Sequence, residues 1–387
     1  MEKKGSGIIP YSRQEIGADD IREVVKVLKS PYLTQGPKIK EFEDALAKYT
    51  GAKYCVVLNS GTAALHAAYF AAGFGKGDEV IVPALTFAAT GNAALYLDAK
   101  PIFADVDPRT GNIDVDDAAR KITKRTKGIV AVDYAGLPAD LAALRALAKK
   151  NRLVLIEDAA QALGATYKNR KVGTISDMTI FSFHPVKSIT TGEGGAILTN
   201  DRSYCEKLLM FRSHGLTRDP KRLKNKKYAS WHQEMQLLGY NYRLTDIQAA
   251  LGVSQMKKLD RFIALRKAAA ASYFKLLSGI PGLALPPQDS LASSAWHLFV
   301  VRVDPNIRDR VFDRLRKEGI GVQVHYLPVY LHPYYAGLGY RKGQCSNAEQ
   351  FSFTALSIPL FPRITPEEQK FVVRKLTSIL QSYGKKG

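Results

Sequence analysis

Residues 178–199, MTIFSFHPVKSITTGEGGAILT, place a lysine on a short loop between two apolar runs. The first run, 178–183, predicts a buried strand, and the second, 196–199, predicts the strand that returns beside it as a hairpin. Burial lowers the pKa of a lysine, and the neutral amine is the form that attacks a carbonyl carbon. Lys187 is therefore the candidate nucleophile around which we expect the rest of the chain to be organised.

Before this hairpin, the chain alternates between strand and helix patterns. Short apolar runs typical of buried strands occur at 54–58, 79–83, 101–104, 128–132 and 153–156. Helix patterns lie at 19–30, from 39 to Gly51, and at 63–72, 86–96 and 139–149. Strands that alternate with helices predict an α/β fold with a mostly parallel sheet.

The C-terminal part of the chain has a different pattern. A polar segment, 212–240, is expected to be a surface loop, and one long helix is predicted after it over 245–277. Strand patterns follow at 297–303 and 320–325, and helix patterns at 308–318 and 366–383. The predicted division is an N-terminal arm (1–17), a large α/β domain (18–250), and a bridging helix with a smaller α+β domain (251–387).

Composition narrows the class of protein. The chain is 46% hydrophobic and 24% charged, which is typical of a globular protein with an ample core. Its three cysteines form no CxxC pair, so neither a disulfide framework nor a metal site is expected. The net charge of +20 accompanies no nucleic-acid-binding signature and suits a polyanionic small substrate. Without a signal peptide or a long apolar run, we expect a cytoplasmic protein with no membrane partner.

Two further features complement Lys187. Residues 60–62, Ser-Gly-Thr, lie between a predicted strand and a predicted helix, so they form either an anion site at the helix N-terminus or a simple cap. Asp158 ends a predicted parallel strand at the edge where ligands bind in open α/β sheets, with a helix cap as the alternative. Glu157 points to the opposite face of that strand.

These features match the needs of pyridoxal phosphate. The phosphate needs donors, the pyridine nitrogen needs an acid partner, and the aldehyde needs an amine. Lys187 is therefore predicted to form the Schiff base. Gln161 is placed to reach the ring hydroxyl or to cover a ring face, and Phe87 is a candidate to stack on the ring, although an isolated phenylalanine is typical of a core.

Five blocks of the chain together resemble a known family. They are NSGTAAL (59–65), PALTFAAT (83–90), EDAAQALGA (157–165), FSFHPVK (181–187) and GYNYRLTDIQAALG (239–252). In this order and spacing they are strongly similar to the DegT-type sugar-nucleotide aminotransferases, which are pyridoxal-phosphate enzymes of fold type I. The resemblance covers nearly the whole chain and implies the same fold here. Some relatives that act as sugar dehydratases replace the lysine by histidine, and Lys187 is retained here.

The resemblance also implies roles for single residues. Lys187 would be the Schiff-base lysine and the proton carrier, while Asp158 would pair with the pyridine nitrogen and Gln161 with the ring hydroxyl. Phe87 would stack on the ring. The phosphate ligands would be Gly61, Thr62, Ser182 and, from the neighbouring subunit of a homodimer, Asn241.

Within the family, the segment 181–195, FSFHPVKSITTGEGG, looks most like enzymes of the pseudaminic acid route, which serves surface polysaccharide or flagellin glycosylation. They aminate C4 of a UDP-linked 4-keto-6-deoxy-hexosamine. The donor would be L-glutamate, with the cofactor as pyridoxamine phosphate in the second half-reaction. The loop YLTQGP, with Thr34, and the segment 324–335, with His325 and Tyr326, would lie near the sugar, and the basic segment 212–227 is the candidate for the diphosphate.

Three alternatives remain at this stage. The acceptor could be another UDP- or dTDP-linked 3- or 4-keto sugar. The scaffold could belong to a non-catalytic regulator or binding protein, although retention of Lys187, Asp158 and Gln161 argues against this. The basic surface could bind nucleic acid through charge alone.

Overall fold

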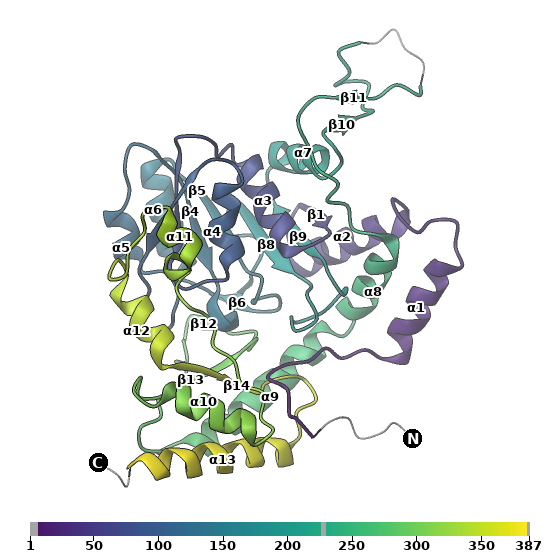
Figure 1. Cartoon of the computed structure of the whole chain (residues 1–387). Helices are drawn as coiled ribbons and strands as arrows, with labels where there is room; N and C mark the ends of the chain where they lie inside the picture. Colours follow the sequence, from purple (N-terminus) through teal and green to yellow (C-terminus); the bar gives the residue numbers. More distant parts are fainter. Residues whose placement is uncertain (1–6, 226–229, 385–387) are drawn as a thin grey trace.

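The computed structural model describes residues 7–225 and 230–384. At its centre is a seven-stranded sheet with the order β1-β9-β8-β5-β4-β2-β3 (Figure 1). The strands are β1 (Tyr54–Leu58), β2 (Glu79–Pro83), β3 (Lys100–Ala104), β4 (Thr126–Val132), β5 (Val154–Asp158), β8 (Met178–Ser182) and β9 (Gly195–Thr199). Neighbours pair in parallel except β9, which is antiparallel to β8 and β1. The mostly parallel sheet and the predicted hairpin are therefore confirmed.

Helices cover both faces of this sheet. One face packs against α3 (Gly61–Ala71), α4 (Ala88–Leu95) and α7 (Arg202–Phe211), and the other against α2 (Pro37–Thr50), α5 (Val115–Arg120), α6 (Leu141–Asn151) and α8 (Asp246–Met256). Strand β1 serves both layers, because Val56 belongs to one buried cluster and Val57 to the other. This two-residue alternation is typical of a strand buried on both faces.

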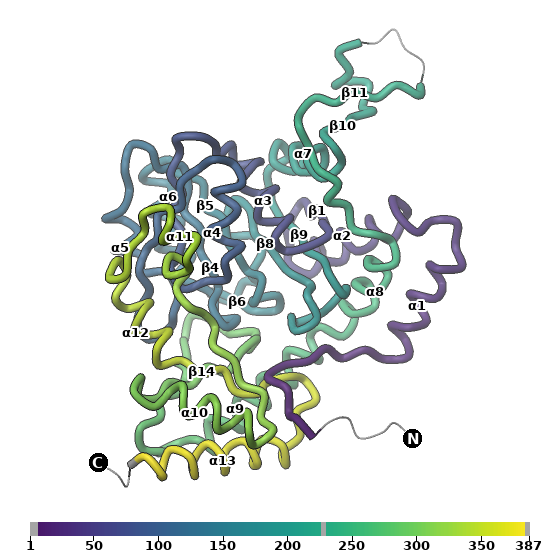
Figure 2. Tube along the Cα trace, viewed as in Figure 1, coloured from purple at the N-terminus to yellow at the C-terminus, as the bar shows by residue number. Residues whose placement is uncertain are grey.

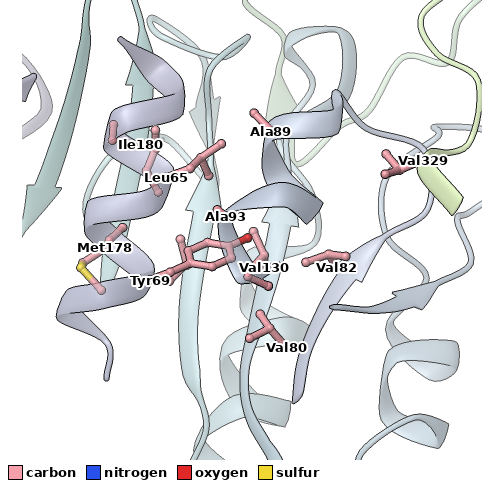
Figure 3. Close-up of a cluster of buried hydrophobic side chains, with 14 of the residues drawn as sticks. Leu65, Tyr69, Val80, Val82, Ala89, Ala93, Val130, Met178, Ile180 and Val329 are labelled. Carbon is pink, nitrogen blue, oxygen red and sulfur yellow. The ribbon is translucent and has the colours of Figure 1, made fainter. Parts of the chain in front are cut away.

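A buried hydrophobic core lies between the sheet and the layer formed by α3, α4 and α7. Figure 3 shows Leu65 and Tyr69 pointing from α3 into this core, near Met178 and Ile180 of β8. Tyr69 is fully buried, and its hydroxyl donates a 2.8 Å hydrogen bond to the carbonyl of Thr90. This bond ties α3 to α4, so the two helices that begin beside the site are held in fixed relation.

Local signals explain where the helices begin and end. Ser60 caps α3, since its Oγ accepts the Ala63 N–H at 3.0 Å. Helix α2 has Pro37 at its first turn and ends at Gly51, whose φ of 83° suits a left-handed cap. The anion site predicted at 60–62 is therefore the start of a properly capped helix, directly after β1.

The C-terminal part forms a second packed unit. Strands β13 (Phe299–Arg302) and β14 (Ala355–Ile358) pair antiparallel and pack with α9 (Leu259–Leu277), α10 (Arg308–Lys317) and α13 (Pro366–Gly384). The N-terminal arm runs along this unit before α1 (Ala18–Leu28), as Figure 2 shows. The arm is fixed by hydrogen bonds from Ile9 N–H to the Gly319 carbonyl and from Leu360 N–H to the Tyr11 carbonyl. The predicted domain boundaries near residues 17 and 250 stay a proposal.

Three predicted elements need correction. The helix expected over 245–277 is two helices, α8 and α9, because the chain makes a tight turn in which Lys258 N–H bonds the Gln255 carbonyl at 2.9 Å. Segment 320–325 is no regular strand, since its backbone partners lie singly on the arm and on β14. Segment 212–240 is more than a loop. It carries a two-strand ribbon, β10 (Leu216–Thr217) with β11 (Glu234–Met235), which projects from the body in Figure 1.

Several short elements carry no clear sequence signal. They are β6 (Thr166–Tyr167), β7 (Arg170–Lys171), β12 (Ala292–Ser293), η1 (Tyr134–Gly136), η2 (Val329–Leu331), α11 (Pro333–Gly337) and α12 (Ser346–Thr354). Predictions that fall on 1–6, 226–229 or 385–387 lie outside the described residues. Over the described ranges, no helix has the length and apolar character needed to cross a membrane.

Candidate active site

A cavity of about 460 Å³ opens at the carboxyl ends of β4, β5 and β8. Nine of the residues predicted for the site line it: Gly61, Thr62, Phe87, Asp158, Gln161, Ser182, Lys187, His325 and Tyr326. The first seven come from the strand ends and helix starts of the central sheet, and the last two from the extended segment after α10. Residues that are far apart in the sequence therefore meet where open parallel sheets bind ligands.

Lys187 lies on the loop between β8 and β9, and its ammonium has no hydrogen bond or ion pair with any described residue. Burial lowers the pKa of Lys187 to about 8, and the nearby charge of Asp158 partly opposes this. A buried amine with a lowered pKa is an available nucleophile near neutral pH. The fold thus supplies what the sequence predicted for this lysine.

The lowered pKa gives a testable pH dependence. The protonated amine cannot attack an aldehyde, so covalent capture of pyridoxal phosphate by the cofactor-free protein should accelerate as pH rises, with a midpoint at about 8. Stopped-flow absorbance of the covalent adduct between pH 6 and pH 10 (a range set about the pKa values of lysine) measures the midpoint. In Asp158→Asn the midpoint should move lower, because Asp158 favours the charged amine. A midpoint at the ordinary lysine value in both proteins would contradict the assignment.

Asp158 is held at the floor of the cavity. One carboxylate oxygen accepts a 2.8 Å hydrogen bond from the Thr90 hydroxyl, and the other accepts the Ala160 N–H at 3.2 Å. Burial raises the pKa of Asp158, whereas these two hydrogen bonds and the nearby Lys187 act in the opposite direction. Both oxygens are therefore oriented by donors, and the carboxylate can pair with a cationic ring nitrogen.

The start of α3 forms an anion cradle. Because Ser60 Oγ takes the Ala63 N–H, the N–H groups of Gly61 and Thr62 are left with no acceptor among the described residues. A Cβ added to Gly61 would lie 3.0 Å from Cβ of Ser182, so glycine permits the close approach of β8. Two free N–H groups at a helix start, with hydroxyls beside them, suit a phosphate.

Gln161, Phe87 and Tyr326 border the space between the lysine and the cradle. Gln161 accepts the Ala135 N–H at 2.7 Å and donates to the Tyr326 hydroxyl at 2.9 Å. Phe87 is 59% exposed at the start of α4, with its ring centroid 5.9 Å from that of Tyr326. The alternative role of Phe87 as a core residue is therefore excluded, because its ring is exposed at the cavity. Phe87 is thus available to stack on a planar ligand.

His325 is buried beside the cavity and stays neutral. Its Nδ1 lies 2.8 Å from Ser357 Oγ, and burial, followed by the charge of Lys187, lowers its pKa to about 3. The hydroxyl of Tyr134 also donates to the His325 carbonyl. A neutral imidazole can exchange hydrogen bonds with a sugar hydroxyl but carries no charge for an anionic group.

Sequence reasoning missed several residues that line the cavity, among them Tyr11 and His297. Tyr11 comes from the N-terminal arm, with its ring centroid 5.5 Å from that of His325. His297, fully buried, has an Nδ1 with no partner among the described residues, and burial pushes its pKa well below the ordinary value. Neither had a signal: the arm shows no periodicity, and His297 opens what reads as an ordinary strand.

Three predicted contacts fall outside the cavity. Thr34 is exposed on the loop between α1 and α2 and bridges to Thr245, and Asn241 is exposed at the base of the projecting ribbon. Neither lines the cavity of its own chain. Arg212, the first cation of the predicted diphosphate segment, is bound to Glu43 and to the Val57 carbonyl at 2.7 Å each. Its guanidinium is held by these two contacts inside the fold, so the prediction that Arg212 binds the diphosphate is wrong.

The residues present fit pyridoxal phosphate, judged by the donor-rich cradle, the unpaired lysine and the oriented carboxylate. The described residues contain no group of three or more His, Cys, Asp or Glu side chains placed to hold a metal ion. This fold and this site define a pyridoxal-phosphate-dependent transaminase of fold type I.

Comparison with known proteins identifies the family. Residues 14–377 match the DegT/DnrJ/EryC1/StrS aminotransferase family, and the chain belongs to it. It is 41% identical over 384 residues to the UDP-4-amino-4,6-dideoxy-N-acetyl-beta-L-altrosamine transaminase of Campylobacter jejuni, covering 98% of this chain and 99% of that one.

Solved structures agree with this assignment. PseC of Helicobacter pylori, an aminotransferase involved in the biosynthesis of pseudoaminic acid, superposes with a TM-score of 0.90 at 34% identity, covering 97% of this chain and 100% of PseC. The PLP form of the sugar aminotransferase Spr1654 from Streptococcus pneumoniae, described as putative, superposes with a TM-score of 0.91 at 30% identity, covering 97% and 99%.

Proposed function

We propose that this protein transfers the amino group of L-glutamate to C4 of a UDP-linked 4-keto-6-deoxy-hexosamine, on a route to pseudaminic acid. The observation that carries the proposal is the one cavity that Lys187, Asp158 and the start of α3 line together. Support for the sugar comes from the Campylobacter relative, whose name specifies a UDP-linked 4-amino-4,6-dideoxy sugar, and from PseC.

The predicted cofactor residues of the cavity each have a task in this reaction. When bound, pyridoxal phosphate would supply an electron sink for the electron pair that stays on carbon when a proton is removed. Lys187 would hold the cofactor aldehyde and would carry the proton, because its pKa of about 8 lets it both accept and return one. Asp158 holds a positive charge on the ring nitrogen. Gly61, Thr62 and Ser182 bind the phosphate, and Gln161 and Phe87 position the ring.

The part of the cavity lined by Tyr11, His325 and Tyr326 is proposed to bind the sugar. Tyr326 and His325 present a hydroxyl and a neutral imidazole there, and Tyr11 adds a second hydroxyl from the arm. Burial raises the pKa of both tyrosines, so they remain neutral donors and acceptors. Neutral polar groups suit sugar hydroxyls, whereas cations for the diphosphate must come from elsewhere.

A homodimer with shared sites is part of the proposal. Asn241 and Thr34 lie outside the cavity of their own chain, on exposed segments that include Leu33, Leu238 and Tyr240. Exposed apolar side chains on a projecting ribbon indicate a protein contact. We propose that the ribbon reaches a second copy, where Asn241 completes the phosphate site and ribbon cations such as Arg218 meet the diphosphate.

Subunit mixing tests the shared site. Asn241→Ala and Lys187→Ala homodimers should each be nearly inactive, whereas a mixed dimer should regain about a quarter to a half of wild-type activity, because one of its two sites is intact. Activity after co-expression with two affinity tags measures this recovery. If Asn241 served its own chain, each site of the mixed dimer would lack one of the two residues, and no activity would return. The double variant mixed with wild type is the converse control, because it keeps an intact site only when both residues act in the same site of one chain.

A half-reaction screen tests the substrate. The protein is loaded with amino groups from L-glutamate, and UDP- and dTDP-linked 3-keto and 4-keto sugars are added one at a time while the cofactor spectrum is followed. The UDP-linked 4-keto sugar should restore the original spectrum fastest. Faster recovery with another keto sugar would reassign the acceptor within the family, and no spectral change with glutamate would remove transamination altogether.

A further inference from the structure

A pair of buried carboxyl groups lies on the face of the sheet opposite the cavity. Asp133 directly follows β4, and Glu157 is in β5 next to Asp158. In the parallel register Ala131 lies opposite Glu157, and Val132 opposite Asp158. Because side chains alternate along a strand, Val132 and Asp158 face the cavity, whereas Asp133 and Glu157 face the other layer. Both are fully buried.

Two carboxyl oxygens of this pair, one from each residue, receive no hydrogen bond from another group in the part of the chain that the structure describes. Glu157 Oε2 accepts from the hydroxyls of Ser176 at 3.1 Å and Thr179 at 2.8 Å. Asp133 Oδ1 accepts the Ala139 N–H at 2.9 Å. The remaining oxygens, Oε1 of Glu157 and Oδ2 of Asp133, have no donor among the described residues, although the two side chains are in hydrogen-bonding contact. One carboxylic acid proton between them satisfies both atoms.

The charges around the pair favour the same conclusion. Burial raises the pKa of both groups, and for Asp133 the next cause is the charge of Glu157 itself. The groups that face the pair are the neutral hydroxyls of Ser176 and Thr179 from the β8 side, the Ala139 N–H before α6, and Asp158 across β5, which is another carboxylate. Neither acid forms an ion pair within the described ranges. Two adjacent buried carboxylates without a cation retain a proton.

We propose that Asp133 and Glu157 share one proton and act together as a positioning pair for Asp158. The two residues link β4, β5 and β8, since Glu157 accepts from Thr179 of β8 and the backbone N–H of Asp133 donates to the Asp158 carbonyl at 3.1 Å. The shared proton also limits the negative charge behind Asp158 to one. A second charge would favour the neutral form of Asp158, which could not hold a cationic ring nitrogen. The positioning role rests on the proposed function, whereas the shared proton does not.

Isotope-edited infrared spectroscopy tests the shared proton. With labelled Asp and Glu, the purified holoenzyme should show the carbonyl stretch of a protonated acid at pH 8 (well above the ordinary pKa of about 4 for these groups). This band should be lost in Glu157→Gln, whose amide donates to Asp133 in place of the proton. Glu41→Gln, which alters a half-exposed carboxylate, is the matched control and should leave the band unchanged. A wild-type spectrum with no such band would overturn the shared proton.

Unfolding gives an independent measurement. The pKa of the pair is raised in the folded state, so its stabilisation is present at low pH and is lost as pH rises toward the folded-state pKa. Between pH 6 and pH 8 the urea unfolding constant of wild type should rise about tenfold per pH unit more steeply than that of Glu157→Gln, as expected for one extra proton in the folded protein. Equal slopes would contradict the proposal, whichever sugar is the substrate.

Rescue tests the positioning role. Glu157→Ala leaves Asp133 with an unpaired charge and should slow the glutamate half-reaction by about tenfold or more, through a misplaced Asp158. Glu157→Gln should restore it to within a few-fold of wild type. If Glu157→Gln is as slow as Glu157→Ala, the pair does not act by positioning. If Glu157→Ala fails to fold, wild type and Glu157→Gln are compared instead. Comparable half-reaction rates and an unchanged acid limb of the pH profile support the positioning role. An acid limb displaced in Glu157→Gln contradicts it.

Discussion

Lys187→Ala is expected to fold and to bind pyridoxal phosphate, yet to lose transamination by roughly a thousandfold or more. The variant removes both the amine that holds the cofactor covalently and the group that carries the proton, and each contributes orders of magnitude. Cofactor affinity should persist in part, because the cradle at the start of α3 and the Asp158 carboxylate are untouched. Single-turnover rates with glutamate measure the loss.

The free energy of unfolding of Lys187→Ala gives a second expected result, with a defined direction. Burial disfavours the charged form of Lys187, and its ammonium has no hydrogen-bond partner among the described residues. Truncation therefore removes an unfavourable buried charge, and the free energy of unfolding should stay the same or increase slightly near pH 7. Lys171→Ala, at a more exposed lysine, is the control and should keep full activity. Borohydride reduction that still fixed the cofactor to the same peptide of the variant would refute the assignment of Lys187.

The sheet could be predicted because its strands are separated by strong local signals. Strands β1 and β2 have the predicted bounds, since Gly, Pro and Asn residues stand at their ends. The break between α8 and α9 could not be predicted in this way. At the break, the ammonium of Lys258 reaches Asp19 and Asp20 of α1 at 2.7 and 2.5 Å. Contacts between residues so far apart in the sequence do not change the local hydrophobic periodicity from which helix ends are predicted.

The same distinction holds in the site. Gly61, Asp158 and Lys187 each lie at a strand end, so the topology of a parallel sheet brings them together without further information. Tyr11 reaches the cavity only because the arm pairs with Gly319 and Leu360, which is a tertiary event. Arg212 shows how the same kind of tertiary contact can mislead a prediction. Its position in a basic segment suggested a ligand contact, whereas in the structure it forms an ion pair with Glu43.

Asp158→Asn is expected to fold normally and to lose about 10²- to 10⁴-fold in kcat/KM, because removing one partner of a buried charge pair costs about 3–5 kcal/mol. The amide keeps the volume of the carboxylate and can still accept the Thr90 hydrogen bond. It cannot hold a proton on the ring nitrogen, so the cofactor becomes a weaker electron sink. Rates of both half-reactions should fall together, since each would depend on the same ring to take up the electron pair of the broken C–H bond.

Thr90→Val separates the charge of Asp158 from its orientation. Valine removes the 2.8 Å hydrogen bond to one carboxylate oxygen while the Ala160 N–H still holds the other, so the loss should be smaller than in Asp158→Asn, at about tenfold. The loss of the Thr90 donor also favours the neutral acid, since that bond lowers the pKa of Asp158. The acid limb of the kcat/KM profile should therefore move to higher pH in Thr90→Val and be absent in Asp158→Asn. Turnover like that of wild type in Asp158→Asn would exclude Asp158 from the ring nitrogen, and an unmoved limb in Thr90→Val would show that another group sets it.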